Sequence, residues 1–488
     1  MNLTLLSAKY AHYCGTGIGG VLIGLAFWYQ SLWWCALLGM VLVVWTIHTT
    51  SSTRRAVMFA LIAGWIKQGM SVWWLLNAYP ADWLGGAPRT HQLGLILFCY
   101  IGTTLTTGAG YGVFAYLLKK GASVHRALFP LYVGICLLIG ELAGAFFFSL
   151  YTYGPHVSLT TYFGYGMSGY ALADHSLLRY GALIGGSFAL TVIVGTIAGS
   201  IVLLITSRQQ KKYLLTALLL GGIILTGYIP FSAHYPPQNE IVAAIGTRYH
   251  SKIYNSPIEA AAAKTVLEES VKEALAAGAR VVVLPEASQL AGNTSSETIL
   301  KLLQEFPHVP NAVVVDSYDT NVATTTSYAR GYIYDIDANT TYTTDKRFIV
   351  PVGEFMPYFH GSVVHALGGD AFFEAMSLRE GDREIPSTAP SYVPSILFCF
   401  ESDSSQIARI KSDRNLIVHV VSHSWFHTPT TLWNQERQAL IVQSLYTHRP
   451  IIQAGNMAPS ALYLPNGTIE YGTIVGEDAF HATIIFSL

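Results

Sequence analysis

Three polar residues in the second half of the chain carry side chains suited to acyl-transfer chemistry. Glu286 and Cys399 each follow directly on a short apolar segment, and Lys346 lies in the stretch 344–348 between them. A thiolate is a strong nucleophile, a carboxylate can take the thiol proton, and an ammonium group lowers a neighbouring thiol pKa and stabilises an oxyanion. The combination predicts nucleophilic chemistry at Cys399, with Glu286 as the base and Lys346 as the positive group.

The cysteine distribution leaves two interpretations of Cys399. The other cysteines all lie in the first half of the chain: Cys14, Cys35, Cys99 and Cys136. Cys399 therefore has no disulfide partner nearby, and a lone cysteine is a candidate nucleophile. The alternative is a small buried hydrophobic residue. Glu286 and Lys346 favour the chemical interpretation, because nothing structural requires all three residue types.

The elements that must position these side chains are short strands alternating with helices. Strands are predicted at 241–245, 281–285, 311–315, 332–334, 395–398 and 416–421, and helices at 257–277 and 437–446. Such alternation is typical of a layered α/β domain. Side chains at the carboxyl ends of its strands are well placed for ligand chemistry. We therefore expect residues 233–488 to form one α/β domain.

The first half of the chain has a different character. Of the 488 residues, 51% are hydrophobic and 12% are charged, whereas a soluble domain is usually about a quarter charged. This composition excludes an ordinary soluble enzyme, a disordered chain and a nucleic-acid-binding tail. Apolar stretches long enough to span a bilayer as helices occur at 14–29, 31–48, 56–78, 92–118, 127–150, 180–206 and 212–231. We expect residues 1–232 to be a membrane domain of about seven spans.

Loop charges predict the orientation of these spans. Residues 1–232 hold 12 Lys and Arg but only 3 Asp and Glu, and the basic residues gather in alternate loops at 54–55, 119–126 and 208–212. Basic loops face the cytoplasm, and Lys9 places the N-terminus there too. An odd number of spans then puts 233–488 in the periplasm. The sequence thus predicts a multi-pass protein of a bacterial inner membrane.

Two ionisable residues, Lys67 and Glu141, fall inside predicted spans. Charge within a membrane is costly and by default indicates function. The alternatives are a mutual ion pair or a lysine that reaches the interface near a helix end. We favour the structural interpretation. In the sixth predicted span, Gly185, Gly186 and Gly195 are expected to let helices approach closely.

Several segments of the second half resemble the catalytic segments of the nitrilase, or carbon–nitrogen hydrolase, superfamily: 282–288, 345–357, 376–382, 398–401 and 422–426. Together with the multi-span first half, the layout is most similar to the apolipoprotein N-acyltransferase family. The resemblance implies a four-layer αββα fold for the soluble domain.

The resemblance also implies roles for particular residues. Glu286 would be the general base, Lys346 would stabilise the tetrahedral intermediate, and Cys399 would carry an acyl thioester. Glu354 would support Lys346 and the base, and Glu401 would orient the nucleophile. The implied reaction moves a fatty acyl chain from a phospholipid donor in the bilayer to the amine of a diacylglyceryl-cysteine lipoprotein. It requires no metal and no cofactor.

Apolar residues near these segments predict contact with a lipid substrate. The stretch 355–378 is rich in large apolar side chains and is expected to form a lid that touches the membrane, with ordinary packing as the alternative. Phe355, Phe372 and Phe373 in this stretch are candidate substrate-binding residues. Trp425 and Phe426 are two further candidates.

Departures from the family pattern leave the acceptor open. The usual Asn-Asp-Ala is replaced by Ser422, His423 and Ser424. Tyr446 stands where the family often has Glu. The family's eighth span is not expected between the second half and Leu488. Two alternatives therefore remain. One is a membrane-anchored amidase or acyltransferase with another acceptor, such as the nitrilase-like proteins of conjugal-transfer gene sets. The other is a non-catalytic membrane scaffold.

Overall fold

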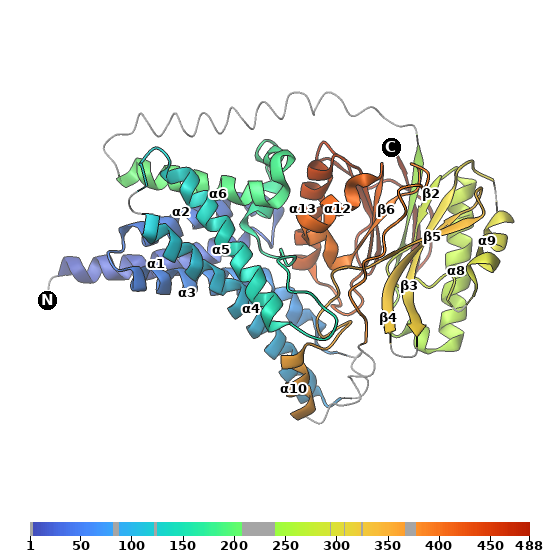
Figure 1. The fold of residues 1–488 in the computed structure, drawn as a ribbon, viewed down its shortest axis with the longest axis horizontal. Helices are drawn as coiled ribbons and strands as arrows, with labels where there is room; N and C mark the ends of the chain where they lie inside the picture. The colour runs from blue at the N-terminus through green and yellow to red at the C-terminus, as the bar shows by residue number, and fades with distance from the viewer. Residues whose placement is uncertain are drawn as a thin grey trace.

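The chain forms a helical part and an α/β part that lie side by side (Figure 1). The computed structural model describes residues 3–81, 87–121, 124–206, 240–292, 294–306, 308–323, 326–366 and 377–488. The long helices of the helical part are α1 (Leu3–Leu25), α2 (Trp33–Thr49), α3 (Thr53–Ser71), α4 (Arg89–Lys120), α5 (Phe129–Tyr151) and α6 (Ala182–Thr206). Two 3₁₀ segments, η2 (Trp73–Ala78) and η5 (Ser168–Asp174), lie toward the α/β part.

Four helical segments of the described residues are long and apolar enough to cross a membrane: Gln30–Thr49, Arg89–Lys120, Phe129–Tyr151 and Leu178–Thr206. The predicted number of seven spans is therefore not confirmed. Helices α1 and α3 occupy the first and third predicted spans, but α3 carries three basic residues, which lower its hydropathy. The seventh predicted span, 212–231, and the predicted domain boundary at 232 lie outside the described residues.

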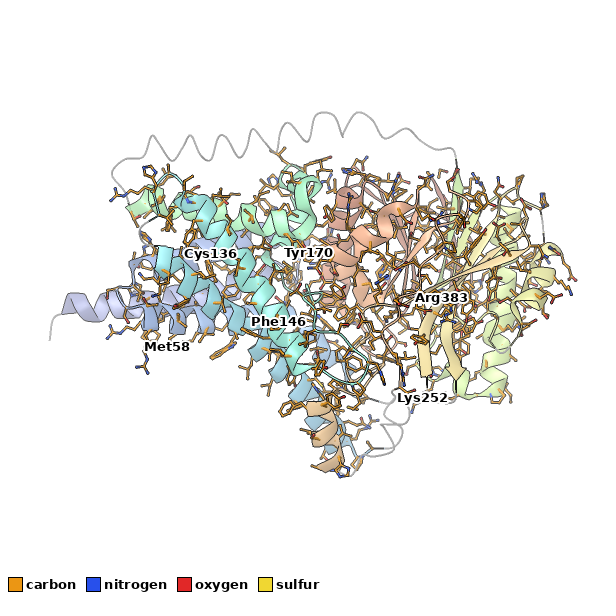
Figure 2. The ribbon with its side chains drawn as sticks, viewed as in Figure 1. Met58, Cys136, Phe146, Tyr170, Lys252 and Arg383 are labelled. Carbon is orange, nitrogen blue, oxygen red and sulfur yellow. The ribbon has the colours of Figure 1, made fainter. Side chains whose placement is uncertain are left out.

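Apolar side chains cover the outside of the helical part as well as its interior. Met58 on α3 and Phe146 on α5, labelled in Figure 2, are 42% and 38% exposed. Lys252 and Arg383 in the same view belong to the α/β part. An outer surface with such side chains is suited to contact with lipid tails, which solvate apolar groups.

The α/β part is built on a mixed sheet. Its strands are β1 (Ile241–Thr247), β2 (Val281–Val283), β3 (Val313–Ala323), β4 (Thr326–Asp335), β5 (Thr340–Asp345), β6 (Ser395–Phe398), β7 (Ile417–Ser422), β8 (Ile451–Asn456), β9 (Ala461–Tyr463), β10 (Ile469–Glu470), β11 (Thr473–Glu477) and β12 (His481–Ser487). One run has the order β11-β12-β1-β2-β3-β4-β5 and the other β6-β7-β8-β9-β10. The runs meet where Thr247 of β1 pairs with Asn456 of β8.

The two runs of strands pack face to face between outer helices. Apolar side chains of both runs share one core, including Val242, Val283, Ile333, Ile396, Val418 and Ile452. Helices α8 (Pro257–Ala276) and α9 (Ser296–Gln304) cover the first run. Helices α12 (Ser405–Ile410) and α13 (Thr430–Thr447) cover the second. The domain therefore has the predicted αββα layers, and Figure 1 shows α12 and α13 on the side of the helical part.

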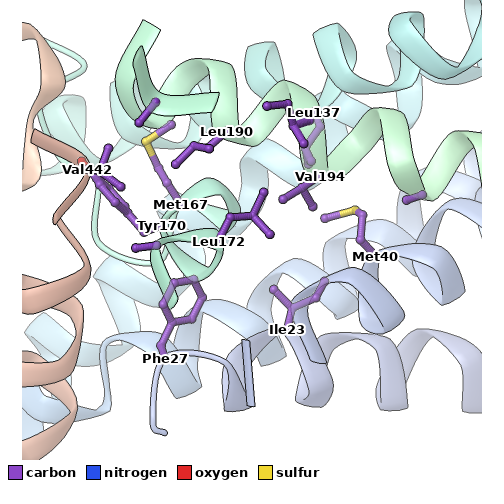
Figure 3. Packing of buried hydrophobic residues seen from close by; sticks show 14 of the residues in the cluster. Ile23, Phe27, Met40, Leu137, Met167, Tyr170, Leu172, Leu190, Val194 and Val442 are labelled. Carbon is purple, nitrogen blue, oxygen red and sulfur yellow. The ribbon is translucent and has the colours of Figure 1, made fainter. Parts of the chain in front are cut away.

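The helical part and the α/β part share one hydrophobic core. Val442 of α13 belongs to the same buried cluster as Tyr170 of η5 and Leu190 of α6, and Figure 3 shows these side chains converging. Helix α6 is interrupted at Gly186, whose φ is +59°. There the amide of Ser187 donates to Ser405 Oγ of α12 at 3.1 Å. The α/β part is thus packed directly on the helices.

The two ionisable residues inside predicted spans form an ion pair. Lys67 Nζ lies 3.2 Å from Glu141 Oε1, and both side chains are buried. The amide of Ser168 donates to both oxygens of Glu141, at 3.0 and 3.1 Å. Of the two structural alternatives left by the sequence, the mutual ion pair is therefore the one present, and Glu141 fixes the start of η5 to the helices.

Candidate active site

Cys399 lies at a sharp turn between a strand and a 3₁₀ helix. Strand β6 ends at Phe398, and the 3₁₀ helix η8 (Cys399–Asp403) begins at once. Cys399 has a φ of +38°, a backbone conformation that is uncommon for a residue with a side chain. Such strain persists only where the surroundings enforce it and is often found at functional sites.

The carboxylate of Glu401 holds this turn in place. It accepts hydrogen bonds from the amide of Phe398 at 3.0 Å, of Arg347 at 2.6 Å and of Phe348 at 3.2 Å. Burial raises the pKa of Glu401, and Lys411 and these amides oppose that effect. Glu401 thereby connects the turn at Cys399 with the segment that follows Lys346.

A buried histidine, which the sequence did not single out, supports the turn from behind. His419 Nε2 lies 3.0 Å from the carbonyl oxygen of Cys399, to which Ser402 Oγ also donates at 3.0 Å. Glu436 and His423 lie beyond it, with His423 Nε2 3.4 Å from Glu436 Oε1. Burial lowers the pKa of His419, although Glu436 raises it. The apolar pattern of β7 gave no sign that its histidine contacts the turn at Cys399.

Lys346 lies between two carboxylates. Its Nζ donates to Glu286 Oε1 at 2.9 Å and to Glu354 Oε1 at 2.6 Å. The other oxygen of Glu354 accepts from the amide of Val350 at 2.6 Å. The structure thus brings Glu286 together with Lys346 and Glu354, which lie on a different segment of the sequence.

The charges around the thiol affect its ionisation. Burial raises the pKa of Cys399 well above its usual value; Glu286 raises it further and Lys346 lowers it. Burial would lower the pKa of Lys346, but Glu286 and Glu354 outweigh this effect and raise that pKa well above its ordinary value. The resting thiol is therefore protonated and the lysine charged, so sulfur attack requires a base at that moment.

Glu286, Glu354 and Cys399 line one pocket of about 450 Å³. One part of its lining is polar and includes Tyr249, Tyr254, Ser317, Asp319, Arg330 and Asn456. Phe400, Trp425 and Phe426 form its aromatic wall. A ligand in this pocket would thus meet both polar and aromatic side chains beside the thiol.

A second cavity adjoins the aromatic wall. Phe400, Trp425 and Phe426 line it from the α/β part, and Trp74, Leu95, Ile96 and Phe148 line it from the helical part. The ring of Trp74 makes edge-to-face contacts with Phe400 at 5.6 Å and Phe426 at 5.1 Å. An apolar space between the helices and Phe400, the residue after Cys399, has the character of a site for a hydrocarbon chain.

The predicted substrate-binding residues have different surroundings. Trp425 and Phe426 line both cavities. Phe355 is buried and lines neither of them. Phe372 and Phe373 lie outside the described residues. In the predicted lid, Tyr358 and Phe359 of α10 (Tyr358–Ala366) are 59% and 55% exposed beside α4.

Comparisons with known proteins cover almost the whole chain. It is 22% identical over 484 residues to the apolipoprotein N-acyltransferase of Ralstonia nicotianae, covering 92% of this chain and 83% of that one. It is 23% identical over 500 aligned positions to the apolipoprotein N-acyltransferase of Thermosynechococcus vestitus, covering 99% of this chain and 91% of that one. The chain resembles apolipoprotein N-acyltransferases along most of its length. The similarity therefore includes both the helical part and the α/β part.

The solved structures that are similar to this chain match about half of it. An amidase from Nesterenkonia, of the nitrilase superfamily, is 11% identical with a TM-score of 0.36 and covers 52% of this chain and 92% of its own. No protein-family model matches the chain.

Proposed function

We propose that the protein is a membrane N-acyltransferase that moves a fatty acyl chain from a phospholipid, through a thioester on Cys399, to the N-terminal amine of a diacylglyceryl-cysteine lipoprotein. The observation that carries the proposal is the meeting of Glu286, Lys346 and Cys399 at a pocket that adjoins an apolar cavity. The similarity to apolipoprotein N-acyltransferases supports the same activity.

In the first step, Glu286 takes the thiol proton as Cys399 Sγ attacks the ester carbonyl of the donor. The carbonyl oxygen becomes negatively charged, and Lys346, already held by Glu286 and Glu354, provides the positive charge that stabilises it. The carbon–oxygen bond to glycerol then breaks. The proton on Glu286 passes to the leaving alkoxide, which leaves a lysophospholipid and the acyl thioester.

In the second step, the acceptor amine attacks the thioester carbonyl and Glu286 takes a proton from the nitrogen. The carbon–sulfur bond breaks, and the proton returns to the sulfur, which releases the amide and restores the thiol. A covalent intermediate divides one difficult transfer into two easier ones. Throughout, Glu401 and His419 keep the backbone of Cys399 in place.

The apolar cavity between the helices and the α/β part supports a lipid donor. It opens beside Phe400, the residue after the nucleophile, and Trp74 and Phe148 extend it into the helical part. An acyl chain in that cavity would leave its ester carbonyl near the thiol. We place the helical part in the bacterial inner membrane with the N-terminus in the cytoplasm and the α/β part in the periplasm, as the loop charges predict.

Intact-protein mass spectrometry tests the thioester. The detergent-purified protein is incubated with phospholipid, and we expect a fatty-acyl mass increment that hydroxylamine removes. The Cys399→Ala variant is expected to show no increment. Folded wild-type protein without an increment, or an equal increment on both proteins, would contradict the proposed mechanism.

Transfer to a synthetic diacylglyceryl-cysteinyl peptide tests the acceptor. We expect the pre-formed thioester to disappear as the N-acylated peptide appears. A thioester that forms but does not react with this peptide would instead favour another acceptor, such as one used in conjugal transfer. Normal biological activity of a protein that lacks Glu286, Lys346 and Cys399 would favour a scaffold.

A further inference from the structure

The catalytic pocket contains one carboxylate that the two chemical steps do not use. Asp319 lies on β3 and lines the same pocket as Glu286 and Cys399. It forms no ion pair with any residue that the structure describes. A carboxylate without a basic partner beside a nucleophile is available to a ligand.

The register of the sheet explains why Asp319 faces the site. Successive side chains of a strand point to opposite faces, so Asp319 shares a face with Ser317. Ser317 Oγ accepts from the amide of Ala287, directly after Glu286, at 3.0 Å. Asp319 also pairs across the sheet with Ala329, whose carbonyl accepts from the amide of Lys346 at 2.9 Å. The strand of Asp319 therefore neighbours β2, which leads to Glu286, and one strand, β4, separates it from β5, which leads to Lys346.

The charge of the pocket is negative on this side. Glu286, Glu354 and Asp319 contribute three carboxyl groups, and Lys346 contributes one positive charge. Burial raises the pKa of Glu354 to about 7, so this group is partly protonated at neutral pH, and Lys346 balances one of the other two. Arg330, which also lines the pocket, is paired with Asp345 through its Nη2 at 3.0 Å. The side chain of Asp319 is open to the pocket, but the protein around it removes part of its hydration and raises its pKa to about 6. Lys346 lowers this pKa, and Glu286 raises it. A cation would relieve this uncompensated charge.

We propose that Asp319 binds the α-ammonium group of the acceptor and so makes the enzyme select cationic amines over neutral nucleophiles. The inference rests on the proposed N-acyltransferase function and assigns the charge of its second substrate. An N-terminal amine has a pKa near 8, so it enters the pocket as an ammonium ion at neutral pH. Asp319 holds that ion beside Glu286. One ammonium proton leaves to solvent before the nitrogen attacks, so Glu286 remains free to take the second proton and return it to the sulfur.

The test separates the two half-reactions. Thioester formation with phospholipid and loss of the thioester to water measure any general effect on the pocket in the Asp319→Asn variant. The variant should lose more in transfer to the amine than in either of these two rates. Its KM for a diacylglyceryl-cysteinyl peptide with a free amine should rise about tenfold, the usual effect of removing one charge-assisted hydrogen bond, with little change in kcat. With a peptide whose α-amine is replaced by hydroxyl, wild type and variant should behave alike.

Glu305→Gln is the matched control, because it removes one negative charge from an exposed position after α9, away from the pocket. It should leave every rate unchanged. An unchanged KM in Asp319→Asn, or equal losses with the amine and hydroxyl peptides, would overturn the inference.

A binding experiment tests the role of Asp319 even if no thioester forms. The Cys399→Ala protein should bind the free-amine peptide more tightly than the N-acetylated peptide, and the double variant Cys399→Ala/Asp319→Asn should bind the two peptides equally. Failure of the thioester assay alone would reject the proposed function. If Cys399→Ala binds the free-amine and N-acetylated peptides equally, the role of Asp319 is rejected.

Discussion

Individual residues around Cys399 act on its thiol in opposite directions. The negative charge of Glu286 raises the pKa of Cys399 and the positive charge of Lys346 lowers it, in addition to the larger effect of burial. The sequence indicated these three residues because each sits in its own local motif. It gave no indication of His419, since a histidine in an apolar strand resembles any other buried residue until the strand is placed behind the nucleophile.

The opposing charges predict opposite shifts in thiol reactivity. Alkylation by iodoacetamide follows the thiolate fraction. Glu286→Gln removes the group that raises the thiol pKa, so alkylation should begin at a lower pH than in wild type. Lys346→Met should move it to a higher pH. Peptide mapping by mass spectrometry distinguishes Cys399 from the other four cysteines. Shifts in the same direction for both variants would show that the charges do not act directly on the sulfur.

At the scale of elements, the break in α6 shows what sequence can and cannot predict. Small residues at 185 and 186 predicted a close approach, and the structure has one, but only the second glycine requires its residue type. Gly186 has a φ of +59°, and a Cβ there would lie 2.6 Å from Ser405 Oγ. Gly185 has extended backbone, and a Cβ there would lie 3.5 Å from its nearest neighbour. The difference depends on α12, which is more than 200 residues away in the chain.

These two positions form a matched pair of variants. Gly186→Ala should destabilise the protein by about 1–3 kcal/mol, because it combines an unfavourable backbone conformation with a steric clash. Gly185→Ala should stay within about 0.5 kcal/mol of wild type. Thermal unfolding in detergent, followed by tryptophan fluorescence, measures both. Equal effects of the two substitutions would mean that the helix break tolerates side chains at either position.

The whole molecule depends on contacts between its two parts. Several strands could be placed from local patterns, since β1, β6 and β7 lie close to their predicted ranges, although β3 extends to Ala323 instead of 315 and α13 begins at Thr430 instead of 437. The apolar cavity could not be predicted from the sequence, because Trp74, Phe148 and Phe426 come together only when the helical part packs on the α/β part. The position of the loop before η5, which includes Gly164 and Tyr165, also depends on contacts with both parts. The amide of Gly164 donates to Asp403 of the nucleophile segment at 2.8 Å, while Gln68 of α3 donates to the carbonyl of Tyr165 at 2.8 Å.

The ion pair inside the helices belongs to this connection, so its loss should affect both stability and chemistry. Glu141 has other donors, from the amide and hydroxyl of Ser168, whereas Glu141 is the one anionic partner that the described residues offer to Lys67. Glu141→Met should therefore lower the stability of the protein by about 3–5 kcal/mol, since it leaves the buried charge of Lys67 unpaired. Lys67→Met should lower the stability by less than Glu141→Met does. The double variant Lys67→Met/Glu141→Met should recover much of that loss.

Thioester formation should fall in the same order among these variants, because Ser168 begins η5 and Gly164, on the loop before it, donates to Asp403 in the segment that follows Cys399. Unfolding in detergent and intact-protein mass spectrometry on the same samples compare the two effects. If Glu141→Met unfolds early but forms the thioester at the wild-type rate while folded, the ion pair stabilises the helices without positioning Cys399. If both properties fall together and both recover in the double variant, the membrane helices shape the catalytic turn as well as anchoring it.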